Sequence, residues 1–504
     1  MEECESGRIG TLGKRVKGNL PRVRIPVPPP IYKTYVASTL FDTKIVNMTK
    51  IESINPSNYQ LLGTVEVSTT NEIEEKVELA RSAQKEWANL GVSKRVSLLR
   101  KCFEDIKSQK DEFALLESRE MGMTITESTS DFDESLEYAY WYFDNAEKYL
   151  SPETTFENDD ELHQVFYEPI GICAVIVPWN FPFANFIWGA LQSLIVGNTL
   201  IFKHSEECPL SGKFLEDTLN KHLPKGVFNE VYGDGEIGKA LVNQDINMIA
   251  FTGSTKTGKY LYELAGKKFI KAVMELGGSA PGIIFEDSNV ELAIESVNSN
   301  RLYNQGQCCD GLKRLIVHES IFDEVVEKIA SIFSMKVIGE AEDTNSELGP
   351  LVAKRQLELL VSQVEDAKAK GAKIIAGGNS LEDKLGGAFF EPTVLSGITF
   401  DMRIWNEETF GPVLPIVKFK TEEEAINLAN DTAYGLGAYI FTEDEEKAER
   451  VCEAVKSGMV SINGTNYIMP FNPFGGYKNS GFGREHGKYG FHDVTQIKVV
   501  AKNK

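Results

Sequence analysis

The chain has 504 residues, of which 42% are hydrophobic and 10% aromatic, so it can build large cores and is not a disordered protein. Its 74 acidic residues outnumber the 53 basic ones, and the net charge of −21 argues against general binding to nucleic acid or to an anionic membrane. No run of about 20 apolar residues is present, so we expect no membrane-spanning helix.

The cysteines and histidines indicate neither a disulfide framework nor a metal site. The seven cysteines include no CxxC pair, and only Cys308 and Cys309 are neighbours. None of the six histidines stands at a metal-binding spacing from a cysteine or another histidine. We therefore expect no metal and a reducing, cytoplasmic location.

Residues 1–47 differ in composition from the rest. They hold eight basic and four acidic residues, with no acid between Glu5 and Asp42, and five prolines exclude a continuous helix. Three interpretations stay open: a disordered extension, a targeting peptide, or a start-codon artefact in which the natural chain begins at Met48. We favour an inert extension or the artefact, because serine is scarce and the prolines interrupt any amphipathic helix.

From residue 69 the chain alternates between helices and strands. Thr69-Thr70-Asn71-Glu72 is a capping-box pattern, and the apolar spacing after it predicts helices to about residue 150. Apolar strands then alternate with helices. We expect strands at 173–177, 199–202, 227–232, 247–251 and 271–276, and helices at 183–196, 209–222, 235–243 and 255–266. This order predicts an α/β fold whose parallel sheet is covered on both faces and binds ligands at the carboxyl ends of its strands.

Two glycine-rich turns resemble phosphate-binding motifs. Gly233-Asp-Gly-Glu-Ile-Gly238 matches GxGxxG after a strand, but no acidic residue ends the next strand as the dinucleotide fingerprint requires. Residues 253–260 nearly match a P-loop, except that Tyr260 stands where a Ser or Thr must bind magnesium. We therefore disfavour a P-loop NTPase, although either turn can offer backbone N–H groups to a phosphate.

Three residues at strand ends or in glycine-rich loops form a candidate catalytic set. Cys309 ends Asn-Gln-Gly-Gln-Cys-Cys, Glu275 precedes Leu-Gly-Gly, and Asn180 lies in Pro-Trp-Asn-Phe-Pro. Taken singly, each has an ordinary structural interpretation as a core thiol, a solvated glutamate or a turn. Together, a nucleophile, a base and an oxyanion donor suit acyl chemistry.

Six motifs in order resemble the signatures of the NAD(P)-dependent aldehyde dehydrogenase superfamily: PWNFP, FTGST, MELGGSAP, NQGQCC, EETFGP and PFGGYKNSGFGRE. The resemblance covers about residues 50–500, and KHSEE and ELGGSAP look closest to bacterial and archaeal semialdehyde and lactaldehyde dehydrogenases. It implies an aldehyde dehydrogenase-like α/β fold that forms a homodimer or homotetramer. The expected parts are a Rossmann-type cofactor domain (48–150 and 170–277), an α/β catalytic domain (278–480) and a small oligomerisation β-element (151–169 and 481–504).

The resemblance also assigns catalytic roles. Cys309 would attack the aldehyde carbon, while the Asn180 amide and the backbone N–H of Cys309 would hold the oxyanion. Hydride would leave to the nicotinamide, and Glu275 would activate the water that hydrolyses the resulting thioester to a carboxylic acid. Relatives that pass the acyl group to coenzyme A usually lack this glutamate. Cys308 is either a packing residue or an oxidation partner of Cys309.

For the cofactor, the resemblance implies NAD, with NADP possible. Lys203 would bind the adenosine ribose, and the carboxylate of Glu206 would repel the 2′-phosphate of NADP. Ser254 would contact the pyrophosphate at a helix N-terminus, and Glu408 would bind the nicotinamide ribose. The other cofactor-binding candidates are Trp179, Gly233, Gly253 and Phe410.

The substrate is the least determined feature. Trp188 and Tyr303 replace two arginines that fix a distal carboxylate in some succinate-semialdehyde enzymes. With Phe181, Ile468 and Phe474 they would form an apolar mouth, so we expect a small uncharged or hydroxylated aldehyde. Succinate semialdehyde stays the alternative, with Arg301 as its carboxylate anchor, unless Arg301 forms a salt bridge on a helix face. A catalytically inactive homologue is disfavoured, because the catalytic set is complete.

Overall fold

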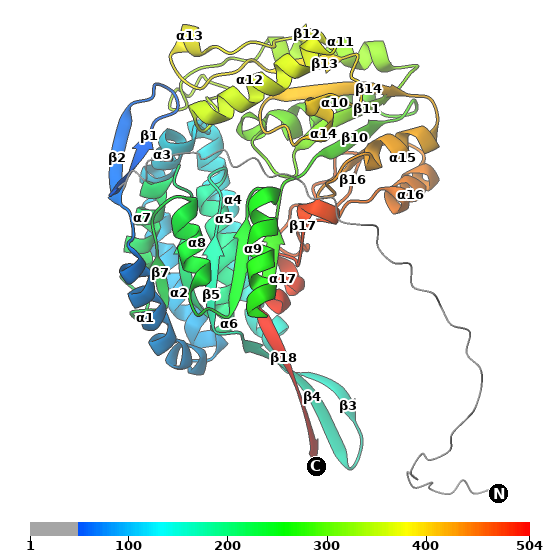
Figure 1. The fold of residues 1–504 in the computed structure, drawn as a ribbon. Helices are drawn as coiled ribbons and strands as arrows, with labels where there is room; N and C mark the ends of the chain where they lie inside the picture. The colour runs from blue at the N-terminus through cyan, green and yellow to red at the C-terminus, as the bar shows by residue number, and fades with distance from the viewer. Residues whose placement is uncertain (1–48) are drawn as a thin grey trace, which may run out of the picture. The chain divides into compact units, whose positions relative to one another are not determined.

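A computed structural model describes residues 49–504 of the chain. The basic N-terminal segment, whose origin the sequence left open, lies outside these residues. Met48–Lys504 form one compact unit built on two large sheets (Figure 1). In the described part of the chain, no helix is long and apolar enough to cross a membrane, and no group of side chains is arranged to hold a metal ion.

The first sheet has six strands in the order β17-β9-β8-β5-β6-β7. Every neighbouring pair is parallel except β17 and β9. The five strands expected between residues 173 and 276 are all confirmed here. The bounds are β5 (Ile172–Ile176), β6 (Thr199–Lys203), β7 (Phe228–Glu230), β8 (Met248–Thr252), β9 (Lys271–Glu275) and β17 (Gly481–Phe482).

Helices cover both faces of this sheet, which explains why its strands are apolar throughout. Ile172, Ala174 and Ile176 of β5 pack toward one group of helices, whereas Cys173 and Val175 pack toward the other. The first group is α1 (Thr70–Asn89), α8 (Gly235–Asn243) and α9 (Thr255–Lys268). The second is α2 (Val92–Ser108), α4 (Ile125–Leu150), α5 (Pro182–Phe186), α6 (Gln192–Val196) and α7 (Pro209–Leu219), with α3 (Lys110–Met121) packed beside α4 and α7.

Two local details refine the expected helices. The capping box of α1 is present: the Thr69 hydroxyl accepts from the Glu72 N–H, and the Glu72 carboxylate accepts from the Thr69 N–H. The helix expected at 183–196 is one helical stretch interrupted by a π-helical turn at Ile187–Leu191, which carries Trp188. Such turns often occur at functional sites.

The second sheet has seven strands in the order β12-β13-β14-β11-β10-β15-β16, parallel except for β12. Helices α10 and α11 cover one face and α15 and α16 the other, while α12 packs beside β13 and β14. The strands are β10 (Ala280–Ile284), β11 (Leu312–His318), β12 (Lys373–Ala376), β13 (Thr393–Ser396), β14 (Val413–Phe419), β15 (Tyr439–Phe441) and β16 (Ser461–Ile462). The helices are α10 (Val290–Leu302), α11 (Phe322–Ser334), α12 (Lys354–Ala369), α13 (Glu382–Leu385), α14 (Arg403–Asn406), α15 (Glu422–Asn430) and α16 (Glu445–Ala454).

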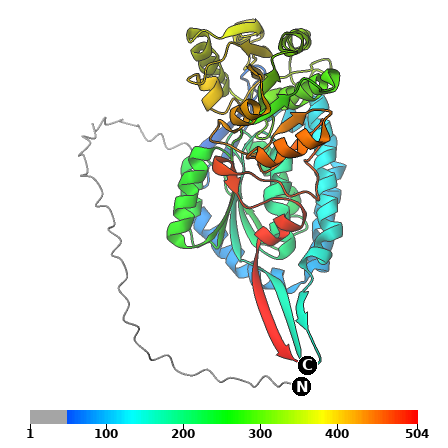
Figure 2. The ribbon, with the colours of Figure 1, turned by 90° about the vertical axis from the view of Figure 1, so that its right-hand side faces the viewer.

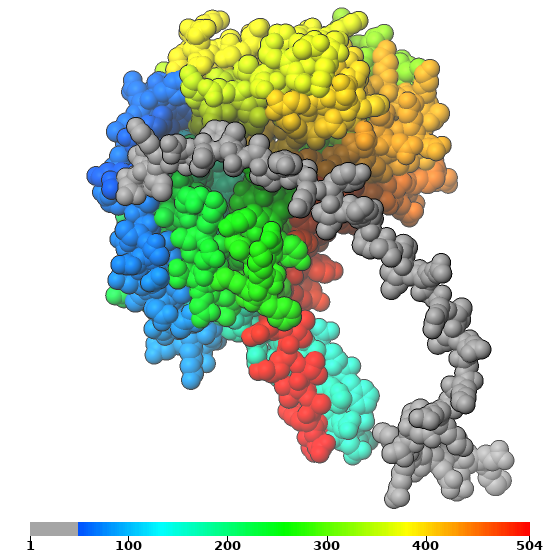
Figure 3. Space-filling model, viewed as in Figure 1, coloured from blue at the N-terminus to red at the C-terminus, as the bar shows by residue number. Residues whose placement is uncertain are grey.

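Two smaller sheets complete the unit. β1 (Lys50–Ile54) and β2 (Leu61–Glu66) form a ribbon, and β3 (Glu153–Glu157), β4 (Glu161–Pro169) and β18 (Thr495–Asn503) form an antiparallel sheet in the order β18-β4-β3. The sheet formed by β3, β4 and β18 projects from the unit as an arm (Figures 1, 2 and 3). Ile497 and Val499 of β18 are each 64% exposed on it.

The C-terminal boundary differs from the expected one. Residues 481–504 were assigned together to the oligomerisation element, but only β18 lies in the arm. β17 pairs with β9 in the first sheet, and α17 (Gly487–Asp493) packs against α4 and α6. The reason is that Phe491 and Val494 are buried in the core of the first sheet, which no local pattern in the sequence revealed.

Candidate active site

A cavity of about 810 Å³ lies where the two large sheets approach each other. Its walls include Thr252 and Glu275, which end β8 and β9, and the Pro178–Phe181 loop that follows β5. Tyr303, Cys309 and Glu408 line it from the other side. The cavity therefore sits at the carboxyl ends of the parallel strands, as the alternating pattern of the sequence predicts.

The nucleophile loop joins α10 to β11 through a tight 3-10 turn at Tyr303–Gly306. Asn304 and Gln305 adopt left-handed conformations with φ of 49° and 54°. Gly306 is also left-handed, and a Cβ there would lie 2.3 Å from Nη2 of Arg301 and 2.5 Å from the carbonyl oxygen of Gly411. Only glycine fits this position, and the turn it allows directs the next residues toward the cavity.

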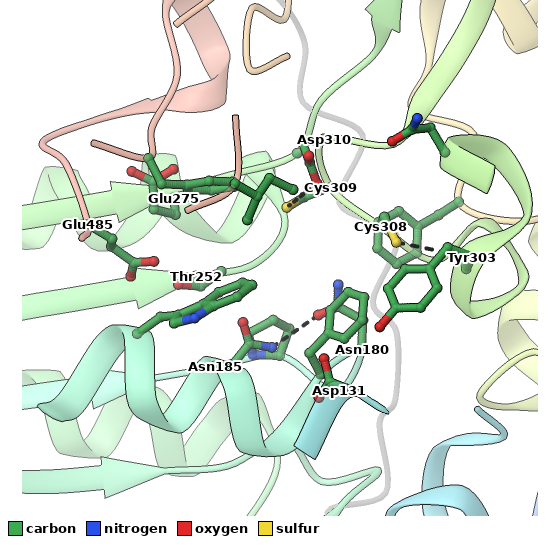
Figure 4. Close-up of a pocket in the computed structure, with 18 of the residues that line it drawn as sticks. Asp131, Asn180, Asn185, Thr252, Glu275, Tyr303, Cys308, Cys309, Asp310 and Glu485 are labelled. Atoms are coloured by element: carbon green, nitrogen blue, oxygen red, sulfur yellow. Dashed lines mark hydrogen bonds between the residues drawn. The ribbon is translucent and has the colours of Figure 1, made fainter. Parts of the chain in front are cut away.

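The two neighbouring thiols have different surroundings. Cys309 Sγ points into the cavity (Figure 4) and lies 4.0 Å from Oδ1 of Asp310. Burial raises the pKa of the Cys309 thiol well above its ordinary value, the Asp310 carboxylate raises it further, and Lys313 opposes them. The Cys308 thiol instead donates to the carbonyl of Tyr303 at 3.6 Å. Cys308 packs with Met121 and Phe181, which agrees with a packing residue.

Asn180 is held in position from three directions. Its Nδ2 donates to the Gln307 carbonyl at 2.9 Å, and its Oδ1 accepts from Asn185 Nδ2 at 3.2 Å. Its backbone carbonyl accepts from Asn304 Nδ2 at 2.6 Å. Because an amide nitrogen carries two N–H groups, one remains available after the bond to Gln307, and Asn180 lines the same cavity as Cys309. This geometry suits an oxyanion donor.

Glu275 is an isolated acid at the end of β9. It is 2% exposed, and neither carboxyl oxygen has a hydrogen-bond partner among residues 49–504. Burial, followed by the nearby Glu485 carboxylate, raises the pKa of Glu275 well above its ordinary value. Burial also raises the pKa of Glu485 to about 8. An acid with a raised pKa, in a cavity and without a structural partner, has the properties of a general base.

The expected cofactor residues fall into two sets. Five of them, Trp179, Gly253, Ser254, Glu408 and Phe410, line the cavity. Lys203 and Glu206 lie outside its lining at the carboxyl end of β6, where Lys203 Nζ is 3.8 Å from Oε2 of Glu206. Gly233 follows β7 at the same edge of the sheet.

This donor set fits a dinucleotide. Ser254 caps α9 and leaves the start of that helix open to a phosphate. Glu408 Oε1 accepts from the Gly278 N–H at 2.9 Å and from Lys313. Oε2 of Glu408 has no hydrogen bond to any residue in 49–504 and can accept from a ribose hydroxyl. The ammonium of Lys203 and the carboxylate of Glu206 supply polar groups of the kind that a second ribose requires.

Five of the six expected substrate residues line the cavity: Phe181, Trp188, Tyr303, Ile468 and Phe474. Phe181 stacks on Tyr303 with ring centroids 5.8 Å apart, and Trp188 lies 6.0 Å from Phe474. An apolar wall is therefore present next to the nucleophile.

Arg301 does not belong to this set, which corrects the expectation that it anchors a substrate carboxylate. It is fully buried and absent from the cavity lining. It forms no salt bridge with any residue in 49–504 either: the guanidinium donates to backbone carbonyls, among them Gly306 at 2.7 Å and Leu312 at 3.1 Å, and also Gly411. Arg301 thus supports the nucleophile loop from behind.

Sequence reasoning missed a group of acidic and phenolic side chains in the same cavity: Asp131, Glu134, Glu137, Tyr138, Asp310, Tyr467 and Glu485. The α4 members stand three and four residues apart, a spacing that places them on one helix face. This spacing could have predicted that the acids share one face of α4, but an acidic helix face is normally solvated and so did not indicate a cavity. Glu485 lies in the FGRE motif, so its position in a motif was a second unused signal.

Comparisons with known proteins show the family of the chain. Residues 45–500 match the model of the aldehyde dehydrogenase family. The chain is 36% identical over 458 residues to retinaldehyde dehydrogenase 3 from Homo sapiens, covering 90% of this chain and 89% of that enzyme. The NAD⁺ complex of an aldehyde dehydrogenase from Bacillus cereus superposes with a TM-score of 0.87 at 34% identity, covering 90% of this chain and 93% of that one. Succinate-semialdehyde dehydrogenase from Burkholderia pseudomallei gives a TM-score of 0.87 at 34% identity, covering 90% and 94%.

These comparisons confirm the superfamily, the fold class, the NAD(P) cofactor and the enzyme class that the motifs led us to expect. The chain belongs to the aldehyde dehydrogenase family.

Proposed function

We propose that the enzyme oxidises an aldehyde to a carboxylic acid by covalent catalysis at Cys309. The observation that carries this proposal is that Cys309, Asn180 and Glu275 all line one cavity. After losing its proton, the thiol attacks the aldehyde carbon and forms a thiohemiacetal. The free N–H of the Asn180 amide and the backbone N–H of Cys309 hold the oxygen that becomes negative.

A nicotinamide held beside Glu408 and Phe410 would supply the acceptor for the hydride that this adduct loses. The thioester left on Cys309 must then be hydrolysed. The Glu275 carboxylate takes a proton from a water molecule, the hydroxide attacks the thioester carbon, and the C–S bond breaks to release the acid and the thiolate. Glu275 performs this step only when ionised, so its raised pKa makes activity increase with pH.

The test is the rate of NADH formation from a panel of aldehydes. Cys309→Ala is expected to abolish the reaction, and Cys452→Ala, a control outside the cavity lining, is expected to retain it. Glu275→Gln is expected to release about one NADH per site and then to slow by roughly 10²–10⁴-fold, because the thioester accumulates. NADH formation that survives in Cys309→Ala contradicts the mechanism.

We propose that NAD is preferred over NADP. The Glu206 carboxylate beside Lys203 supports this, because it would repel a 2′-phosphate. Initial rates with each cofactor test the preference, and Glu206→Ser is expected to improve the use of NADP. A preference for NADP above about tenfold, some 1.4 kcal/mol, would overturn the proposal.

For the substrate, the apolar wall supports a small aldehyde that is uncharged or hydroxylated at its far end. Succinate semialdehyde is the second candidate, because a relative of known structure is a succinate-semialdehyde dehydrogenase. One observation argues against succinate semialdehyde: among residues 49–504, the one basic side chain in the cavity lining is Arg355, and it is already bound to Glu207 at 2.7 Å, so no free cation is present for a second carboxylate. The comparison of kcat/KM for propanal, lactaldehyde and succinate semialdehyde decides between them.

We further propose that copies of the chain associate through the β18 edge of the arm. Exposed Ile497 and Val499 on an edge strand support this, because unpaired strand edges favour pairing with another chain. Sedimentation of the intact protein and of a Val499→Lys variant tests it: the variant is expected to dissociate.

The cytoplasmic location and an oxidation role for Cys308 stay predictions.

A further inference from the structure

One face of α4 brings carboxylates to the substrate side of the cavity. Asp131, Glu134, Glu137 and Tyr138 all belong to the cavity lining. Asp131 appears in Figure 4 near Asn180 and Tyr303. Asp133, the residue between two of these acids, points elsewhere: it is exposed, and Lys110 Nζ lies 2.6 Å from its Oδ2. Among the acids of this face, Asp131 is buried, whereas Glu134 and Glu137 line the cavity but are exposed.

Asp131 is the most informative of these residues. It is 6% exposed, and its Oδ2 is buried without a hydrogen-bond partner among residues 49–504. The hydroxyl of Tyr138, about two helical turns further along α4, is also buried and has no hydrogen-bond partner among residues 49–504. Buried polar groups in native proteins are nearly always satisfied, so unpartnered ones that line a cavity indicate a polar ligand.

Burial, followed by the charges of Glu117, Glu134 and Glu127, raises the pKa of Asp131 well above its ordinary value, so a bound cation would favour its ionised form. Asp131 and Glu134 also act on two tyrosines that line the cavity. Burial raises the pKa of Tyr303 well above its ordinary value, and the charges of Asp131 and Glu134 add to this effect. Tyr138 is affected in the same way, by burial and then by Glu134, Asp310 and Asp131. Tyr138 on α4 and Tyr303 in the loop after α10 are therefore both affected by the charges of Asp131 and Glu134.

Among residues 49–504, the cavity lining holds one basic side chain, and that side chain is already paired. The basic residue among its lining residues in 49–504, Arg355, projects from α12 and binds Glu207. Aromatic rings line the cavity together with these acids, and Trp188 packs 5.7 Å from Tyr138 and 6.0 Å from Phe474, measured between ring centroids. Carboxylates combined with aromatic rings are the surroundings in which proteins bind ammonium groups, through charge-assisted hydrogen bonds and cation–π contacts.

We propose that the preferred substrate is an aldehyde whose far end carries a protonated or quaternary amine, which Asp131 and Glu134 bind while the aldehyde carbon reaches Cys309. This inference rests on the proposed function and names its substrate class. It differs from the uncharged aldehyde that the apolar wall alone supports, because the apolar wall does not include the α4 carboxylates, and the charge series below decides between the two. The folded unit adds a long-range attraction, since residues 48–504 carry a net charge of −25 once the eight basic and four acidic residues of 1–47 are set aside.

A charge series with matched shapes tests the inference. The cationic substrates are 3-aminopropanal and 4-(trimethylammonio)butanal. Their neutral counterparts are 3-hydroxypropanal and 5,5-dimethylhexanal, the second of which has the same shape as the quaternary amine. 3-Oxopropanoate supplies the anionic case. We expect kcat/KM to be at least about tenfold higher for each cation than for its neutral counterpart, through a charge-assisted hydrogen bond for the primary amine and through charge attraction and cation–π contact for the quaternary amine.

Variants on α4 assign the preference to its residues. Glu134 is exposed, so Glu134→Gln is expected to fold, and it should reduce the cation-to-neutral ratio of kcat/KM by about tenfold. Asp131→Asn, of nearly the same shape, should reduce the ratio as well. Asp133→Asn, on the same helix but outside the cavity lining, should leave it unchanged.

The possible failures are distinguishable. Neutral aldehydes that equal or exceed their cationic counterparts overturn this inference while leaving the dehydrogenase activity in place. So does a Glu134→Gln variant in which both substrate types decline together. Absence of NADH formation with every member of the series overturns the proposed function itself.

Discussion

Lys313 and Glu408 form a nearly buried ion pair, with Nζ 2.5 Å from Oε1 and 1% of the lysine side chain exposed. The same Nζ lies 2.7 Å from the carbonyl oxygen of Cys309 and 3.0 Å from that of Gly278. One ammonium group therefore connects the nucleophile loop to the carboxylate that we expect to bind the nicotinamide ribose.

Replacing Lys313 by methionine should separate these two loops. We expect a higher KM for NAD, a lower kcat, and a loss of about 3 kcal/mol in the free energy of unfolding, because Glu408 loses its buried partner. Urea denaturation and initial rates measure both effects. Lys328→Met, which removes a lysine from an exposed pair with Glu291, should cost at most about 1 kcal/mol. Equal behaviour of the two variants would contradict the coupling.

Asp310 should control the reactivity of the thiol beside it. The Asp310 charge contributes to the raised pKa of Cys309, second to burial. Asp310→Asn removes that charge and keeps the shape, so the thiol pKa should fall and alkylation by iodoacetamide at neutral pH should become faster. Asp323→Asn, an exposed control, should alkylate like the parent. Unchanged or slower alkylation in Asp310→Asn would show that the carboxylate does not act on the thiol.

The pH dependence of activity should move when Glu485 is replaced. Glu275 must be ionised to activate water, so activity rises with pH. Glu485, whose own pKa is raised to about 8, carries its charge at alkaline pH and there keeps Glu275 protonated. Glu485→Gln removes this repulsion, lowers the pKa of Glu275 and should move the rise in kcat to lower pH. The surface control Glu449→Gln should leave the rise in kcat at its original pH. The same result for Glu485→Gln would falsify the effect of Glu485 on the pKa of Glu275.

Arg301 should prove to be a positioning residue rather than a substrate anchor. Its removal as Arg301→Met leaves the buried carbonyls of Gly306, Leu312 and Gly411 without their donor. Each unpaired carbonyl costs about 1–3 kcal/mol, so we expect a clear loss of stability together with a lower kcat for every aldehyde. Arg450→Met removes an exposed pair with Glu422 and should cost less than about 1 kcal/mol. A loss limited to carboxylate-bearing aldehydes would restore the anchor interpretation.

Much of this molecule follows from its sequence, although not all of it. The continuous apolar strands from Ile172 to Glu275 and the capping box at Thr69 are local signals, and both are confirmed. Cys309, Glu275 and Asn180 were recognisable because their chemistry and their positions at strand ends coincide. The role of Arg301 was not recognisable, because an arginine on a helix has the same sequence signature whether it faces a substrate, a carboxylate or a set of buried carbonyls.

The sequence by itself determined the fold class and the family and predicted the catalytic set, because these depend on hydrophobic alternation and on residue types in short motifs. Only the tertiary structure decided which side chains share the cavity. Asp131 and Tyr303 are far apart in the chain, and α4 meets the loop that carries Cys309 only when the helices and strands of the two large sheets pack together. The charge of the substrate wall is a sum over such distant residues, so the motifs indicated an apolar mouth where the folded chain presents carboxylates among aromatic rings. The uncharged substrate was therefore a reasonable expectation from the motifs, and the cationic one is an inference from the packing.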